Sequence, residues 1–162
     1  MGEVDLKMAK RYWLMKSEEK VYSIRDLEGD GRTYWEGVRN YEARNLMRDQ
    51  MKVGDGVLFY HSNAKPPGVA GLAEVARTGY PDHFAFDMKN EYFDPKSDSD
   101  NPRWFMVDVA FVEAFREVLS LEEIRATPEL GEMALVKRAR LSVQPVEKEA
   151  FQLIRKMGRE KK

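Results

Sequence analysis

The chain has 162 residues, of which 43% are hydrophobic and 34% charged, and its formal net charge is −1. This length and balance predict one globular domain and exclude an intrinsically disordered chain. The absence of cysteine excludes disulfides, thiolate zinc sites and cysteine nucleophiles, and the small net charge means that any contact with DNA or RNA must come from a local patch.

The first part of the chain predicts a strand, two helices and a tight turn. Residues 1–10 are interpreted as a flexible leader, and the apolar run at 12–15 predicts a strand buried on both faces. Ser23 is expected to cap a short helix, because it precedes an acidic residue at the third helical position. Apolar residues at helical spacing predict a second helix over 40–50. Glycines on both sides of an aspartate then predict a turn over 52–56.

The middle of the chain predicts three strands. These cover 57–61, 69–75 and 104–115. Gly71 lies inside the second of them and indicates a bulge or a close approach of another backbone. Residues 78–103 are rich in Pro, Asp, Asn, Ser and Lys, and are interpreted as a long surface segment of the kind that is often functional.

The last part predicts a helix, a strand and a closing helix. Ser120 is expected to cap the first helix, with Glu123 completing a capping box. A strand is expected over 138–146 and a helix over 147–157, whose apolar residues lie on one stripe. The basic residues 159–162 are interpreted as a solvated tail.

This order of elements is not a regular alternation of strand and helix, so a Rossmann-type parallel sheet is not expected. A small mixed barrel or curled sheet with peripheral helices, in a single α+β domain over residues 11–158, fits better. The chain contains no GxGxxG, GxxxxGK[ST] or GxSxG motif. Its two histidines, His61 and His83, lack the spacing of a zinc site. We therefore expect no cofactor and no metal.

No apolar run approaches the roughly 20 residues of a membrane span, and the N-terminal residues lack an apolar signal core. We therefore expect no membrane partner. A cytoplasmic location is the default expectation, and a nuclear one is equally allowed in a eukaryote.

Four clusters combine aromatic rings with compact polar groups. They lie at 13–18, 35–41, 60–63 and 140–145. Aromatic faces beside amide, hydroxyl and guanidinium groups are the chemistry of a nucleobase pocket, in which the base stacks on a ring while polar groups read its edge. The alternative is plain packing. That alternative fits Trp13 and Trp104 better, whereas the polar neighbours of Trp35 favour a functional role.

The same segments carry a family resemblance. The chain resembles the EVE domain family in the runs YWLMKSE at 12–18, WEGVRNYEARN at 35–45, MKVGDGVLFYHSN at 51–63, GVAGLAEV at 68–75, YFDPKSD at 92–98, NPRWFMVDV at 101–109 and RLSVQPV at 140–146. One departure is visible, because the family usually reads KSEP where Glu19 stands here. The loop after the first strand is therefore expected to be looser than in the family.

The resemblance implies a PUA-like mixed β-barrel with flanking helices, and a pocket that accepts a modified base such as a modified cytosine in DNA or RNA. By this likeness, stacking falls to Trp35, and recognition of the base edge to Ser17, Asn40 and Ser62. Polar contacts at the pocket wall or with phosphate fall to Lys16, Arg39 and Gln144. Val38 and Tyr60 complete the predicted set of ligand-binding residues.

Two other functions stay open at this point. An enzyme acting on a nucleotide or a small planar metabolite would use Glu18 or His61 as an acid–base group. A protein-interaction module would use the 78–103 segment as its contact surface. A non-catalytic reader of a modified base is the preferred hypothesis, with a nucleic acid as the partner and the chain as a monomer.

Overall fold

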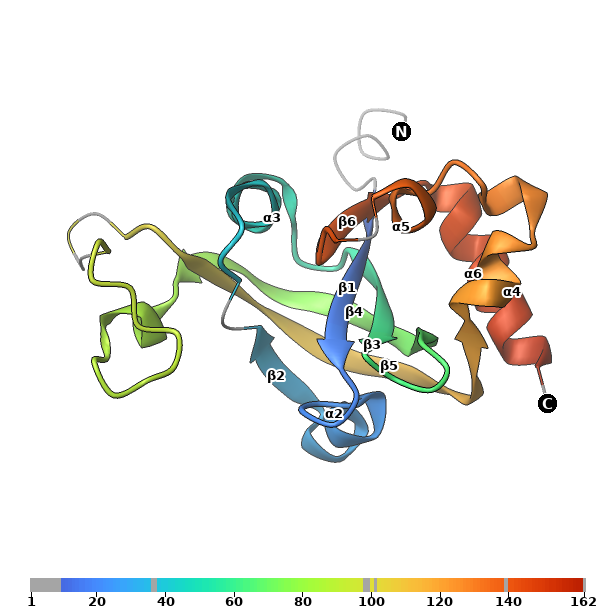
Figure 1. Ribbon diagram of the computed structural model, residues 1–162, viewed down its shortest axis with the longest axis horizontal. Coiled ribbons are helices and arrows are strands. Elements are labelled where there is room, and N and C mark those ends of the chain that lie inside the picture. Colours follow the sequence, from blue (N-terminus) through green and yellow to red (C-terminus); the bar gives the residue numbers. More distant parts are fainter. Residues whose placement is uncertain (1–9, 36–37, 98–99, 101, 139, 162) are drawn as a thin grey trace, which may run out of the picture.

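The computed structural model describes residues 10–35, 38–97, 100, 102–138 and 140–161, so most of the expected leader lies outside it. One mixed sheet of six strands, in the order β2-β5-β4-β3-β1-β6, runs through the molecule (Figure 1). The strands are β1 (Tyr12–Glu18), β2 (Arg32–Trp35), β3 (Gly56–Ser62), β4 (Gly68–Pro81), β5 (Phe105–Ser120) and β6 (Val143–Val146). Because β2 and β6 are the ends of this order, the barrel-like sheet is open.

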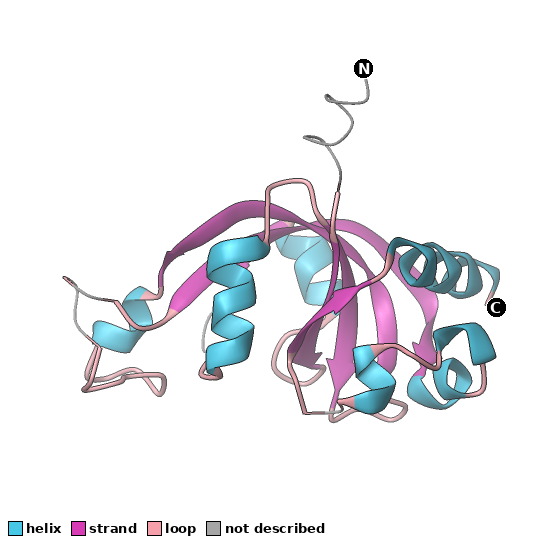
Figure 2. Ribbon diagram, turned by 90° about the horizontal axis from the view of Figure 1, so that it is seen from above, coloured by secondary structure: helices cyan, strands magenta, loops and turns pink. Residues whose placement is uncertain are grey.

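Short helices flank the curved sheet (Figure 2). They are α2 (Ile24–Asp30), α3 (Tyr41–Asn45) with the π-helical turn η1 (Leu46–Gln50), the 3₁₀ turn η2 (His83–Phe86), α4 (Leu121–Arg125), the 3₁₀ turn η3 (Pro128–Leu130), α5 (Ala134–Lys137) and α6 (Lys148–Glu160). No helix in the described part of the chain is both long and apolar enough to span a bilayer.

The sheet separates two hydrophobic cores, because successive side chains of a strand point to opposite faces. The first core contains Met15 and Phe59 and is closed by buried side chains of α2, α3 and η1. The second core contains Leu14 and Leu58 and is closed by buried side chains of α4 and α6. These two cores define what we call the first face and the second face of the sheet.

The helix starts follow the local signals of the sequence. Ser23 and Ser120 both form complete capping boxes, in which each hydroxyl accepts from a backbone N–H three residues on. Asn40 caps α3, since its side-chain oxygen accepts from the N–H of Ala43 at 2.9 Å. The predicted helix at 40–50 is therefore confirmed, although its second half is π-helical.

The close approach predicted at Gly71 is confirmed. A Cβ added there would lie 2.3 Å from the carbonyl oxygen of Glu113, and the β4–β5 register shifts between Val69 and Gly71.

Several strand boundaries differ from the prediction. β2 was not predicted, and the strand expected over 138–146 is limited to β6. β4 extends to Pro81 and β5 to Ser120, so the expected surface segment at 78–103 begins as strand. The reason is tertiary, because β4 and β5 pair with each other as far as Pro81 and Phe105 and thereby satisfy the backbone of polar stretches.

Candidate nucleic-acid interface

The ends of β1 and β3 bring two of the predicted polar clusters together. These strands are parallel neighbours, and their register places Ser17 opposite His61 and Glu18 opposite Ser62. The Ser17 hydroxyl donates to the carbonyl of Tyr22 at 2.6 Å, which fixes the chain that leads from β1 into α2. Hydroxyl and imidazole groups thus meet at one end of the parallel pair.

Trp35 lies on the first face and is the last residue of β2. Its side chain is 9% exposed, and its ring packs edge-on against Phe59 with 5.5 Å between centroids. Phe59 in turn packs edge-on against His61 at 5.8 Å. We define the Trp35 row as five residues: Trp35, Phe59, His61, Ser17 opposite His61, and the buried Val38.

His61 is a buried, neutral histidine and not a surface one. Its side chain is 4% exposed, and its Nε2 accepts from the backbone N–H of Ile24 at 3.0 Å, so the ring proton resides on Nδ1. Within the described residues Nδ1 has no hydrogen-bond acceptor, and the nearest carboxylate oxygen, of Glu19, is 3.7 Å away. Burial lowers the pKa of His61, although the carboxylates of Glu19 and Asp26 act against this shift. The site therefore holds a buried N–H donor beside aromatic rings.

Three of the predicted residues lie on the second face instead. The Lys16 ammonium stands over the ring of Tyr60, 5.6 Å from its centroid, and Tyr60 belongs to the second core. Gln144 is fully buried opposite Leu14 of the same core, and its Nε2 donates to the carbonyl of Leu141 at 2.8 Å. Burial lowers the pKa of Lys16. The sheet thus separates Lys16, Tyr60 and Gln144 from Trp35.

Arg39 fastens the long segment that follows β4. Its guanidinium donates to the buried carboxylate of Asp82 at 3.0 Å and to the carbonyl of Tyr92 at 2.6 Å, and it lies 5.3 Å from the centroid of Trp104. Figure 1 shows this segment extending from the sheet beyond α3. Arg39 therefore holds the segment after β4, and Asn40 fixes the start of α3. Residues 36–37 lie outside the described part.

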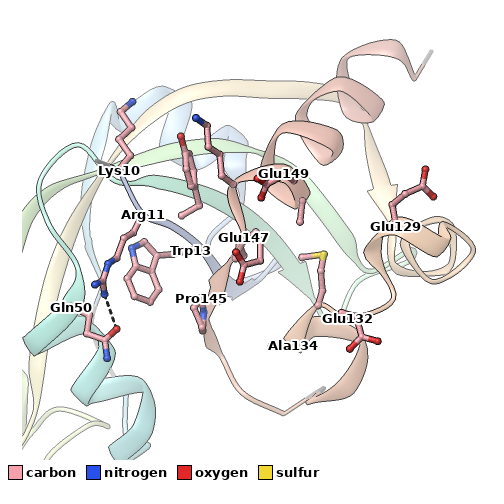
Figure 3. A pocket seen from close by; sticks show the side chains of 15 residues that line it. Lys10, Arg11, Trp13, Gln50, Glu129, Glu132, Ala134, Pro145, Glu147 and Glu149 are labelled. Carbon is pink, nitrogen blue, oxygen red and sulfur yellow. Dashed lines mark hydrogen bonds between the residues drawn. The ribbon is translucent and has the colours of Figure 1, made fainter. Parts of the chain in front are cut away.

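A cavity of about 830 Å³ lies elsewhere, next to β6 (Figure 3). Trp13 and Pro145 line it, and an Arg11–Gln50 hydrogen bond lies beside the indole. None of the nine predicted ligand-binding residues lines this cavity. Its charged lining residues are the acidic Glu129, Glu132, Glu147 and Glu149 and the basic Lys10, Arg11 and Lys148. This excess of carboxylates disfavours a polyanion.

The nine predicted ligand-binding residues do not include Phe59 or His61, although His61 belongs to the predicted cluster 60–63 and was the candidate acid–base group of the alternative enzyme. Both lie in the predicted strand 57–61, and their period of two was the signal that they share a face. Glu18, the alternative acid–base group, is exposed and pairs with Ser62 in the sheet. The arrangement brings an indole that is 9% exposed, a hydroxyl and a buried N–H donor together on one face of the sheet. Groups of these kinds recognise flat heterocycles.

Comparisons with known proteins identify the family of the chain. The family model for the EVE domain matches residues 11–157. Thymocyte nuclear protein 1 of Homo sapiens is 41% identical over 92% of this chain and 74% of that protein. A hypothetical protein from Leishmania major is 52% identical, with a TM-score of 0.91 over 94% of this chain and 97% of that chain. The crystal structure of human THYN1 protein in complex with DNA containing 5-methylcytosine is 41% identical, with a TM-score of 0.86 over 94% of this chain and 99% of that chain.

A more distant likeness supports the fold alone. The YTH domain of Zygosaccharomyces rouxii MRB1 protein is 11% identical and has a TM-score of 0.53. With these neighbours, the predicted α+β fold of the PUA-like class is confirmed. The chain belongs to the EVE domain family.

Proposed function

We propose that this chain binds a nucleic acid through one modified base, with a methylated cytosine as the first candidate, and does not convert it chemically. The observation that carries the proposal is the Trp35 row, in which an indole, a hydroxyl and a buried imidazole N–H come from three different strands. The likeness to human THYN1 protein, whose structure contains 5-methylcytosine DNA, supports this choice of ligand.

Trp35 is assigned the stacking role. Stacking on an aromatic side chain contributes roughly 1–3 kcal/mol per base. Ser17 and Asn40 are assigned to the base edge, and the Asn40 side-chain oxygen is used by the helix cap, which fixes the direction of its amide donor. Ser62 follows Tyr60 by two residues in β3 and therefore lies on the second face, so it is not assigned to the base edge. Val38 adds apolar contact beside Trp35. Lys16, Tyr60 and Gln144 lie across the sheet from Trp35 and are assigned no contact with the base. Arg39, which is bound to Asp82, is assigned to hold the segment after β4.

The absence of conversion is part of the same proposal. A general acid–base pair needs two titratable groups within reach of the substrate. Here Glu18 is exposed, whereas His61 is buried and neutral with its Nε2 committed to Ile24. The proposed partner is therefore a bound nucleic acid and not a substrate, and the cytoplasmic or nuclear location stays a prediction.

The test compares Trp35→Ala with the neighbouring Tyr34→Ala. Tyr34 is 48% exposed and precedes Trp35 on the opposite face of β2, so it controls for a change at the same strand. We expect Trp35→Ala to weaken binding of an oligonucleotide that contains one 5-methylcytosine by roughly 1–3 kcal/mol, and Tyr34→Ala to bind it as the wild type does. Fluorescence anisotropy measures both.

Loss of the buried indole also affects stability, since a buried aromatic deletion costs about 3–5 kcal/mol. Trp35→Phe is therefore included, because it keeps a ring for packing and stacking, and thermal unfolding is followed for every variant. The proposal is wrong if folded Trp35→Ala binds the modified oligonucleotide as tightly as the wild type.

A further inference from the structure

A cluster of arginines and rings lies at α3 and at the residues just before β5. It consists of Tyr41, Arg44, Arg48, Arg103 and Trp104, which we call the α3 patch. Tyr41 is 51% exposed and stacks on Trp104, with 4.9 Å between centroids and 27° between ring planes. The guanidinium of Arg44 lies 4.7 Å from the centroid of Tyr41. An exposed ring and a cation are thus held together immediately after the Asn40 cap.

The Arg44 guanidinium is fixed by neutral acceptors. Its NH1 donates to the carbonyl of Arg103 at 2.9 Å, and its Nε and NH2 donate to the side-chain oxygen of Asn45 at 3.0 and 2.7 Å. A guanidinium whose orientation is already set loses little further conformational entropy when it binds an anion.

Charges around the patch do not cancel. Arg39 pairs with Asp82, Arg48 with Asp49, and Arg103 with Asp94 at 3.9 Å. Arg44 makes no ion pair within 4 Å in the described part of the chain. Partial burial and the neighbouring charges of Arg48 and Arg103 lower the pKa of Arg44, although Tyr41 and Asp49 act against this shift. The patch therefore has one cation more than it has paired carboxylates.

We propose that the Arg44 guanidinium, held on Tyr41, binds the phosphodiester backbone of the nucleic acid whose modified base occupies the Trp35 row; this inference rests on the proposed function. Two observations connect the patch with that row. Trp35 and Val38 share the first core with Ala43 of α3, the helix that carries Tyr41 and Arg44. Arg39, which directly follows Val38, has its guanidinium 5.3 Å from the centroid of Trp104. A planar guanidinium matches the geometry of phosphate oxygens, and a local cation supplies the attraction that a net charge of −1 does not.

The experiment measures affinity for two ligands over a series of salt concentrations. One ligand is an oligonucleotide with a single 5-methylcytosine, and the other is free 5-methyldeoxycytidine, which has no phosphate. Arg44→Gln is expected to weaken the oligonucleotide about fivefold near 0.15 M salt, and to reduce the salt slope by roughly 0.9 for duplex DNA or 0.7 for a single strand. Binding of the nucleoside should not change. Arg116→Gln, an exposed arginine on the far half of β5, serves as the matched control and should change neither.

Three further variants test the surroundings of the Arg44 guanidinium without altering Arg44 itself. Asn45→Asp replaces the neutral acceptor by a carboxylate and should reduce the salt slope in the same direction. Tyr41→Ala removes the ring below the guanidinium and should weaken the oligonucleotide, whereas Tyr41→Phe keeps the ring and should bind normally. These positions are exposed, so the fold does not depend on them.

The outcomes separate this inference from the proposed function. If the wild type binds both ligands and neither Arg44→Gln nor Asn45→Asp changes the salt slope, the phosphate role is wrong and the base site stands. The phosphate role is also wrong if Arg44→Gln weakens the nucleoside as much as the oligonucleotide, or if the patch binds only an acidic peptide. If the wild type binds neither ligand, the proposed function itself fails.

Discussion

The three tryptophans have different surroundings, although the sequence presents each beside polar residues. Trp13 is 1% exposed and donates from Nε1 to Asp55 at 2.9 Å, and Trp104 is 6% exposed and donates to Asp94 at 2.6 Å. Both were predicted as core residues, which is confirmed. Their acceptors could not be predicted, because Asp55 lies 42 residues from Trp13 along the chain. Trp35 is also buried in the first core, at 9% exposed, but its ring packs edge-on against Phe59 at the candidate site.

His61 makes the stability of the fold depend on pH. Burial lowers its pKa below the 6.5 of an unfolded chain, so the unfolded state binds the proton more readily. The contribution of His61 to the free energy of unfolding should therefore be constant above about pH 6.5. It should decrease as the pH drops from about 6.5 toward the pKa of His61 in the folded state.

Urea unfolding between pH 5 and 8, measured for three proteins, tests this dependence. In His61→Gln the loss below pH 6.5 should be smaller than in the wild type, because the titrating group is gone while an oxygen can still accept from Ile24. His83→Gln, at an exposed histidine, should follow the wild-type curve. Identical curves for wild type and His61→Gln would rule out this role of His61.

At the level of elements, the helix starts follow from local sequence motifs, whereas the pairing of strands does not. The capping serines Ser23 and Ser120 act on N–H groups three residues away, so a short stretch of sequence contains the whole motif. β2 is different, since its Arg, Thr and Tyr are stabilised by pairing with β5, some 75 residues later. The same dependence on distant partners explains why β4 and β5 are longer than predicted.

Two glycines in different elements should respond to alanine in opposite ways. In Gly71→Ala the new Cβ would lie 2.3 Å from the Glu113 carbonyl oxygen, so β4 and β5 must separate, and we expect a loss of about 1–3 kcal/mol of unfolding free energy. Gly29 lies in α2 with nothing within 4 Å of an added Cβ. There alanine should be neutral or stabilising by up to about 1 kcal/mol, because it favours the helix.

Chemical denaturation of the two variants measures this difference. A Gly71→Ala protein as stable as Gly29→Ala would contradict the close contact between β4 and β5.

For the molecule as a whole, the candidate site could be predicted only in part. Its polar groups were placed correctly at strand ends, and Ser17 does meet His61. Lys16 and Ser17 are adjacent in sequence, however, and a strand sends neighbouring side chains to opposite faces. Which of the two joins Trp35 depends on the register of β1, β3 and β6, and that register is a property of the folded sheet.

The whole molecule also presents two competing places for a ligand. The first is the Trp35 row on the first face, with the α3 patch, where the charge of Arg44 is not balanced by an ion pair among the described residues. The second is the cavity beside β6, where four acidic side chains stand against three basic ones. A polyanion should therefore choose the first place.

The indole N–H signals of the three tryptophans, followed by NMR during titration with a 5-methylcytosine oligonucleotide, test this choice most directly. Trp35 reports on the base site, Trp104 on the α3 patch and Trp13 on the cavity beside β6. We predict that the Trp35 signal shifts most, that the Trp104 signal shifts less, and that the Trp13 signal stays in place. A shift of Trp13 alone, with Trp35 unchanged at saturation, would contradict the account.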